Sequence, residues 1–159
     1  MKYRTGIGQD SHRFLKNEAT KKCMIAGIPF EDVPGMDADS DGDIVFHAIC
    51  NAITSLTHTP ILGKVAIDLC DKEGITDSRV YLDKAYETLG SQKIEHLALT
   101  IEGKRPKLQK RIDEIRQSVA TALKLSTRQV GITVTSGDGL TAFGQGEGLV
   151  SFCILTTVE

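Results

Sequence analysis

The segment Gly6-Ile7-Gly8-Gln9-Asp10-Ser11-His12 organises the chain. If it continues a strand that begins at Lys2, Asp10 and His12 lie two residues apart and project from the same face. The glycines before them interrupt the strand where the backbone approaches another element closely. A carboxylate beside an imidazole suits a borderline cation such as zinc, although the pair alone is equally compatible with a polar strand end. The segment therefore raises the question of where a third ligand lies.

A helix predicted over residues 43–56 supplies a candidate for that ligand. We expect Ser40 or Asp41 to cap its first amides. Asp43, His47 and Asn51 are four residues apart and form a polar line along one face. The opposite face carries an apolar stripe, formed by Ile44, Ala48, Ile49, Ala52 and Ile53. A histidine in such a helix usually has only a structural hydrogen-bond partner, but here an Asp-x-His pair lacks a third ligand.

The bulk composition is that of a globular protein. The 159 residues fit one domain, residues 1–159, and the hydrophobic and charged contents of 40% and 25% are ordinary. The formal net charge of -2 gives no basic field that would attract nucleic acid. No run has the length of a membrane span, and the N-terminus lacks the apolar core of a signal peptide. The cysteines form no CxxC pair, so we expect buried thiols in the cytoplasm: Cys23, Cys50, Cys70 and Cys153.

The rest of the pattern predicts an α+β fold with the order β-β-α-α-β-α-β-β. Strands are expected at residues 3–8, 23–30, 94–102, 130–134 and 149–158. Further helices are expected at residues 79–89, opened by Asp77 or Ser78, and from Pro106 to about residue 123. Residues 13–22 and 57–77 are predicted as loops, the second because of Pro60 and Gly63. The last strand is apolar on both sides, which indicates a sheet surface buried against something, such as other subunits.

Two other segments carry chemistry. Residues 100–107 place Lys104, Arg105 and Lys107 at a strand-to-helix junction, which is either an anion site or a solvated basic turn. Residues 135–148 are dense in glycine, with amides and hydroxyls that can cradle phosphate, and Asp138 could hold a hard cation. A strand is expected after this segment, which argues against a dinucleotide fingerprint. Metal ligands, phosphate cradles and cations together indicate phosphoryl transfer by positioning and charge neutralisation.

Several motifs together resemble the family of 2-C-methyl-D-erythritol 2,4-cyclodiphosphate synthase, of the non-mevalonate isoprenoid pathway. The resemblance covers nearly the whole chain. The pairing of Asp-x-His with Ser-Asp-Gly-Asp-x-x-x-His is its specific part. The motifs are Gly6-x-Gly8-x-Asp10-x-His12, Ser40-Asp41-Gly42-Asp43-x-x-x-His47, Asp77-Ser78, Pro106-Lys107 and Gly144-x-Gly146-Glu147-Gly148.

The resemblance implies a lyase that converts 4-diphosphocytidyl-2-C-methyl-D-erythritol 2-phosphate to the 2,4-cyclodiphosphate and releases CMP. It implies zinc at Asp10, His12 and His47, and a second divalent ion, magnesium or manganese, at Asp138. Ser136 and the residue at position 39 are implied to assist the transition state. The implied substrate contacts are Asp10, His12, Asp39, Ser40, Leu62, Gly63, Asp68, Gly103, Lys104, Pro106, Lys107, Thr135 and Ser136.

The resemblance also implies a single-domain sheet-and-helix sandwich, ferredoxin-like in character. Its sheets pack together in a homotrimer with the active sites between subunits. No nucleic acid or membrane partner is implied.

The chain departs from the family pattern around the substrate. Asp39 replaces the usual histidine, and Asn51 replaces an aspartate that would orient His47. Residues 61–63 read Ile-Leu-Gly where Asp-Ile-Gly is usual, Asp138 replaces a glutamate, and Gln145 stands where an arginine is common. Two alternatives therefore stay open. One is a metal-dependent phosphohydrolase, and the other is a trimeric binding protein that has lost turnover.

Overall fold

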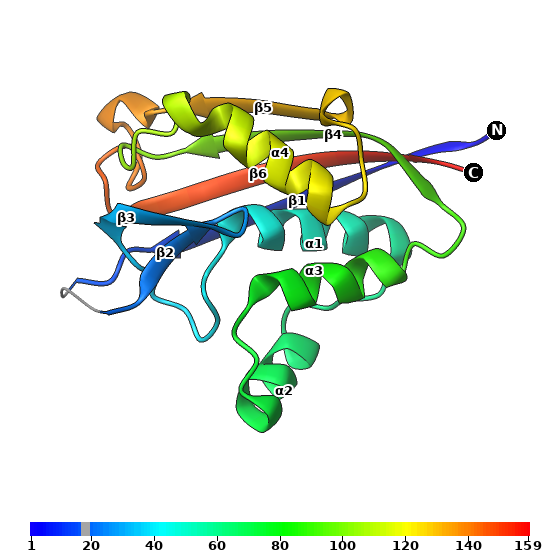
Figure 1. The fold of residues 1–159 in the computed structure, drawn as a ribbon, viewed down its shortest axis with the longest axis horizontal. Helices are drawn as coiled ribbons and strands as arrows, with labels where there is room; N and C mark the ends of the chain where they lie inside the picture. The colour runs from blue at the N-terminus through cyan, green and yellow to red at the C-terminus, as the bar shows by residue number, and fades with distance from the viewer. Residues whose placement is uncertain (17–19) are drawn as a thin grey trace.

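The computed structural model describes residues 1–16 and 20–159, and it has a mixed α+β architecture (Figure 1). A four-stranded sheet has the order β1-β6-β4-β5, in which only β4 and β5 run parallel. Helices α1 and α4 cover one face of this sheet, and a small hairpin, β2-β3, lies at one end. The strands are β1 (Tyr3–Arg13), β2 (Lys22–Ile25), β3 (Ile28–Pro34), β4 (Lys93–Glu102), β5 (Val130–Thr135) and β6 (Gly148–Val158). The α+β prediction is confirmed.

The helices are α1 (Ile44–Thr57), α2 (Lys64–Glu73), α3 (Ser78–Glu87) and α4 (Ile112–Ala122). Short 3-10 turns are η1 (Gln109–Arg111), η2 (Thr127–Gln129) and η3 (Gly137–Gly139). Helix α3 packs against α1, whereas α2 projects away from the sheet (Figure 1). Among the described residues, no helix has both the length and the apolar character needed to cross a membrane.

Strand β1 and helix α1 touch directly through their backbones, as the glycines of the first motif predict. A Cβ atom on Gly6 would lie 2.3 Å from the carbonyl oxygen of Ala52, and one on Gly8 would lie 2.1 Å from that of Ala48. Only glycine permits such an approach. The predicted apolar stripe of α1 is confirmed, since all five of its side chains are fully buried. This contact fixes the position of α1 relative to Asp10 and His12.

Strand β1 is longer than the strand predicted at residues 3–8, and the predicted second strand is in fact a hairpin. Strands β2 and β3 are joined by Ala26 and Gly27, whose φ angles are 53° and 72°. The apolar alternation continues through this tight turn, so the sequence pattern does not mark it. The predicted loop at residues 13–22 includes residues 17–19, which lie outside the described residues. The two end residues of the predicted loop belong to strands, because Arg13 is the last residue of β1 and Lys22 is the first residue of β2.

Two further predictions were wrong. The loop predicted at residues 57–77 contains helix α2, which has only one fully buried residue, Leu69, and no side-chain cap, so it lacks a helical signature. The helix predicted from Pro106 begins at Ile112, after η1. Directly after β4 the backbone bonds to other segments and does not begin a helix. The amides of Gly103 and Lys104 donate to the carbonyl oxygens of Thr135 and Phe143. These amides are therefore not free, contrary to the prediction of a helix start there.

The cap of α1 also differs from the prediction of Ser40 or Asp41. Asp43 is the N-cap, and its carboxylate accepts hydrogen bonds from the amides of Val45 and Phe46. The same carboxylate accepts from the amides of Ala26 and Gly27 in the β2-β3 turn, at 2.9 and 2.6 Å. Asp43 thus joins the hairpin to the start of the helix that carries His47.

Candidate metal and substrate site

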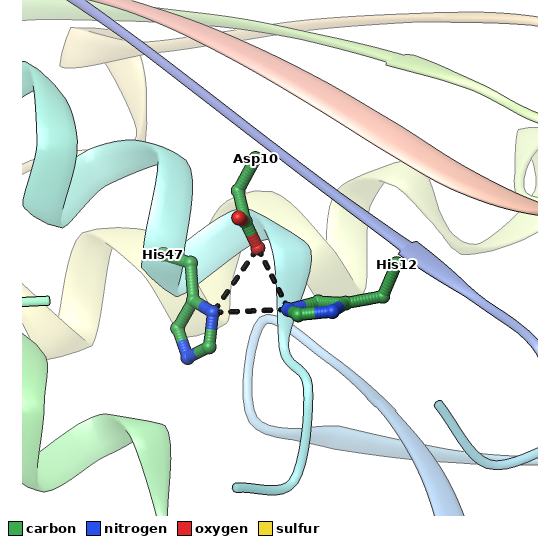
Figure 2. Close-up of side chains that lie close together, drawn as sticks. All are labelled: Asp10, His12 and His47. Carbon is green, nitrogen blue, oxygen red and sulfur yellow. Dashed lines mark hydrogen bonds and ion pairs between the residues drawn. The ribbon is translucent and has the colours of Figure 1, made fainter. Parts of the chain in front are cut away.

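Asp10, His12 and His47 converge on one point (Figure 2). The extended backbone of β1 places Asp10 and His12 on the face that meets α1, and His47 projects toward them from the first turn of that helix. Asp10 Oδ2 lies 3.1 Å from both His12 Nε2 and His47 Nδ1, and these two nitrogens are 3.4 Å apart. The three residues could together hold a divalent metal ion.

The electrostatics of the cluster favour an ionised carboxylate. Burial opposes the charge, but hydrogen bonds and charges from His12 and His47 outweigh burial and hold the pKa of Asp10 below its ordinary value. His47 is buried, whereas His12 and Asp10 are about one-fifth exposed. The cluster is therefore shielded on the helix side and open on the other.

The second ring nitrogen of His47 has a partner that sequence reasoning missed. Nε2 lies 2.7 Å from Ser78 Oγ, at the start of α3, and Ser78 in turn bonds Asp41. Asn51 was expected to be the outer partner of His47, but its amide donates to the carbonyl oxygen of Gln9 instead. In the sequence, the only indication that Ser78 has a functional role is its position in the Asp77-Ser78 motif.

The open side of the cluster faces a cavity of about 500 Å³. The three side chains of the metal cluster line it. Four further predicted substrate contacts also line it: Asp39, Ser40, Leu62 and Gly63. Helices α2 and α3 add wall residues that the sequence did not indicate, among them Ile67, Cys70 and Tyr81. Ile67 and Cys70 were missed because residues 57–77 gave no helical pattern, whereas Tyr81 lies on a predicted helix and reaches the cavity because α3 packs on α1.

Asp68 is not among the residues that line this cavity. The predicted contact lies on α2, and its carboxylate pairs with Lys72 one turn further along, at 3.2 Å. Its neighbours Ile67 and Cys70 face the cavity in its place.

A second, smaller hollow of about 180 Å³ gathers the other predicted contacts. They come from two chain segments, the end of β4 and the end of β5, which run parallel: Gly103, Lys104, Pro106, Lys107, Thr135 and Ser136. Both lysines are exposed. Arg105 turns elsewhere, since its Nε donates to the carbonyl oxygen of Gly146 and its guanidinium lies over the ring of Phe14. This hollow offers hydroxyls and two cations to an anion.

The glycine-dense segment folds back beside this hollow. Ser136 Oγ accepts from the amide of Asp138, whose backbone is left-handed with a φ of 48° and whose side chain is exposed. Thr141 donates to Glu102 at the end of β4 and accepts from the amide of Gly144. Strand β6 follows directly, as predicted, so this segment does not open a helix.

The two hollows lie at the same end of the sheet, but β6 lies between β1, which lines the larger cavity, and β4, which leads into the smaller hollow. On β6, Val150 pairs with Ser11 of β1 on one side and with Glu102 of β4 on the other. Glu102 then pairs with Thr135 of β5. Neighbouring strands are about 4.8 Å apart, so Ser11 and Thr135 are separated by roughly 14 Å. No residue lines both hollows in the described part of the chain.

Comparison with known proteins finds relatives over nearly the whole chain. A model of the YgbB family matches residues 3–158. A relative from Chlamydia caviae, named 2-C-methyl-D-erythritol 2,4-cyclodiphosphate synthase, is 57% identical over 99% of this chain and 90% of its own. A relative of the same name from Chlamydia trachomatis serovar L2 is 54% identical over 99% of this chain and 89% of its own.

The fold has counterparts among solved structures. A structure described as 2C-methyl-D-erythritol-2,4-cyclodiphosphate synthase in a form bound to CDP matches with a TM-score of 0.84 at 25% identity. The match covers 98% of this chain and 100% of that one.

Proposed function

The chain belongs to the YgbB family, and on that basis we propose that it is a lyase of isoprenoid biosynthesis that makes a cyclic diphosphate. The substrate is 4-diphosphocytidyl-2-C-methyl-D-erythritol 2-phosphate. An oxygen of its 2-phosphate attacks the β-phosphorus, and the bond from that phosphorus to the oxygen of the CMP phosphate breaks. The products are 2-C-methyl-D-erythritol 2,4-cyclodiphosphate and CMP. The nucleophile belongs to the substrate, so the chain has to fold a polyanion onto itself and offset its charge.

The convergence of Asp10, His12 and His47 carries this proposal. Ligand atoms about 2.0–2.1 Å from a tetrahedral zinc ion lie about 3.3 Å apart, and the three separations here are 3.1, 3.1 and 3.4 Å. Two imidazoles and a carboxylate also suit zinc better than magnesium. We therefore assign zinc to this site, with the cavity side left for a phosphate oxygen. A divalent ion bound there neutralises phosphate charge and polarises the phosphorus centre.

We assign the erythritol 2-phosphate end of the substrate to the larger cavity. Ser40 and Gly63 line it together with Leu62, and Asp39 stands on its wall where the family has a histidine. A carboxylate there supplies no positive charge to phosphate, so Asp39 orients hydroxyls of the substrate. Asp68, on the adjoining helix, approaches the substrate only if α2 shifts toward the cavity.

We assign the cytidine nucleotide to the smaller hollow. Lys104 and Lys107 are exposed cations beside Thr135 and Ser136, which supports an anionic ligand there. The Ser136 hydroxyl is proposed to donate to the transferred phosphorus group. Asp138, exposed two residues later, is proposed to hold the second divalent ion, magnesium or manganese, which would offset phosphate charge there.

We further propose that residues 1–159 form one domain that assembles as a homotrimer. The sheet face opposite α1 is open to solvent, and it carries Ile7, Phe152 and Ile154 with 61%, 42% and 48% of their surface exposed. An apolar sheet face of this kind favours burial against another copy. Trimer formation would also bring the larger cavity of one subunit against the smaller hollow of its neighbour. We place the enzyme in the cytoplasm, because all four cysteines lie in the described residues and are free.

The test is to incubate the purified protein with the diphosphocytidyl substrate and magnesium, and to assign the products by phosphorus NMR. A cyclic diphosphate with one equivalent of CMP is expected. A linear phosphate product would identify a metal-dependent phosphohydrolase instead. Binding of metal and CMP without any release of CMP from substrate would identify a binding protein.

A further inference from the structure

A chain of hydrogen bonds leads from His47 away from the metal ligands. His47 Nε2 lies 2.7 Å from Ser78 Oγ, and Ser78 Oγ in turn bonds Asp41 Oδ1. The backbone amide of Ser78 donates to the other carboxylate oxygen of Asp41, at 3.1 Å. Ser78 is fully buried and His47 is nearly so. The hydrogen bond between His47 and Ser78 is therefore shielded from water, whereas Asp41 is half-buried, and His47 Nε2 depends on Ser78 for a partner.

The direction of each hydrogen bond follows from Asp41. Its carboxylate can only accept, and it takes three donors: the amide and hydroxyl of Ser78 and the amide of Asp43. The single proton of the Ser78 hydroxyl therefore points at Asp41. The lone pairs of Ser78 Oγ are left for His47, so the proton between them sits on His47 Nε2. His47 Nδ1 is then the nitrogen left for a metal ion. In the metal-free protein it lies 3.1 Å from Asp10 Oδ2, which can only accept, so Nδ1 donates to Asp10 until a metal ion displaces that proton.

We propose that Asp41 and Ser78 are positioning residues that fix the ring tautomer and orientation of His47 for metal binding. Neither residue belongs to the Asp10-His12-His47 cluster or lines the cavity that the cluster faces. Outer partners of metal-binding histidines commonly act in this way, and their loss costs about 10- to 100-fold in metal affinity. The inference deepens the proposed function, because it rests on the metal site assigned to Asp10, His12 and His47.

Two substitutions test the two hydrogen bonds one at a time. Ser78→Ala removes the acceptor, so both tautomers of His47 become accessible, and zinc affinity should fall by about 10- to 100-fold. Asp41→Asn should weaken zinc binding at least as much. An amide that donates to Ser78 turns the serine hydroxyl toward His47, which favours the tautomer with a proton on Nδ1 and opposes binding.

The matched control is Asp77→Ala. Asp77 caps the same helix start by accepting from the amide of Arg79, but it makes no contact with His47 in the described structure. It should lower stability while leaving zinc affinity unchanged. Zinc affinity is measured for each apoprotein by competition with a chromophoric chelator, without any activity assay.

Nuclear magnetic resonance tests the tautomer itself. The chain has four histidines, so long-range nitrogen–proton spectra of histidine-labelled apoprotein can resolve each ring. Wild type should show a proton on His47 Nε2, with or without a second proton on Nδ1 that Asp10 accepts, and an Nε2 that carries no proton would overturn the inference even if the variants do not fold. Unchanged zinc affinity in Ser78→Ala would overturn it as well. If wild type itself binds no zinc, the metal assignment fails instead, and the tautomer measurement still decides the role of Ser78.

Discussion

A Cβ atom on Gly8 would lie 2.1 Å from the carbonyl oxygen of Ala48, so strand β1 and helix α1 meet backbone to backbone one residue from His47. This spacing determines whether a ligand on the helix can reach two ligands on the strand. Gly8 belongs to the same strand face as Asp10 and His12, and Ala48 follows His47 in the helix. The glycines of the first motif thus serve the metal site by setting the distance between its two supports.

Gly8→Ala should therefore damage both stability and metal binding. The added methyl group has to push α1 away from β1, and such overpacking costs about 1–3 kcal/mol. Chemical denaturation and zinc titration would measure the two effects. Gly131→Ala is the control, because a Cβ atom there meets nothing closer than 3.7 Å. Equal losses in both variants would mean that any glycine-to-alanine change in this sheet is destabilising and that the contact with Ala48 is unimportant.

Much of the fold and the metal cluster could be predicted because periodicity sets the direction of a side chain. The two-residue repeat of β1 aligns Asp10 with His12, and the buried stripe of α1 leaves His47 on a defined face. Contacts between elements that share no such pattern could not be predicted. Ser78 meets His47 only because α3 packs on α1, and nothing in the local sequence encodes that packing.

The elements that the sequence missed have weak local signals for definite physical reasons. The hairpin turn uses Ala26, a residue that rarely adopts positive φ, so it lacks the usual Asn-Gly or Gly-Gly signature. Helix α2 rests on the cavity with little buried surface, so its apolar periodicity is faint. The wall residues Ile67 and Cys70 of the larger cavity were not predicted for that reason.

Asp43→Asn should destabilise the protein more than loss of an ordinary helix cap. The Asp43 carboxylate accepts from four backbone amides, two in α1 and two in the β2-β3 turn, whereas Asp77 accepts from one. An amide in its place has to point a donor at one of these amides. We expect a loss of about 2 kcal/mol or more, against about 1 kcal/mol for Asp77→Ala. Urea unfolding of both variants provides the comparison. Equal losses in the free energy of unfolding would mean that the hydrogen bonds from Asp43 to the β2-β3 turn add no stability.

His47→Ala should remove the bound metal without affecting assembly. One of three ligands is lost, so zinc affinity should fall by more than the roughly 100-fold that follows loss of an outer partner. The open sheet face lies on the opposite side of the sheet from α1, so the oligomer should persist. Metal analysis and light scattering measure the two properties, with His58→Asn, at the exposed end of α1, as the control. Wild-type zinc content in His47→Ala would exclude it as the third ligand.

Metal binding should weaken as the pH falls, and the histidines should account for the loss. Because the pKa of Asp10 is held below its ordinary value, this carboxylate stays ionised to lower pH than an ordinary aspartate, and its stabilising contribution is lost only as the pH falls through that lowered pKa. An imidazole has to be neutral to bind metal, so protons compete with zinc for His12 and His47. Zinc affinity should therefore fall progressively as the pH is lowered while Asp10 is still ionised. Affinity that stays constant to pH 5 would argue against two histidine ligands.

Cys70 should be the one cysteine that reacts readily with a thiol reagent in the native protein. Burial raises the pKa of Cys23 to about 12 and also raises the pKa of Cys50 and Cys153, and all three side chains are inaccessible. Cys70 is only half-buried and lines the larger cavity beside Tyr81. With Ellman's reagent at pH 8, we expect one fast equivalent in the native state and four after denaturation, with the fast phase absent in Cys70→Ala. Persistence of that phase in the variant would show that another thiol opens to solvent and that the buried core is looser than the structure indicates.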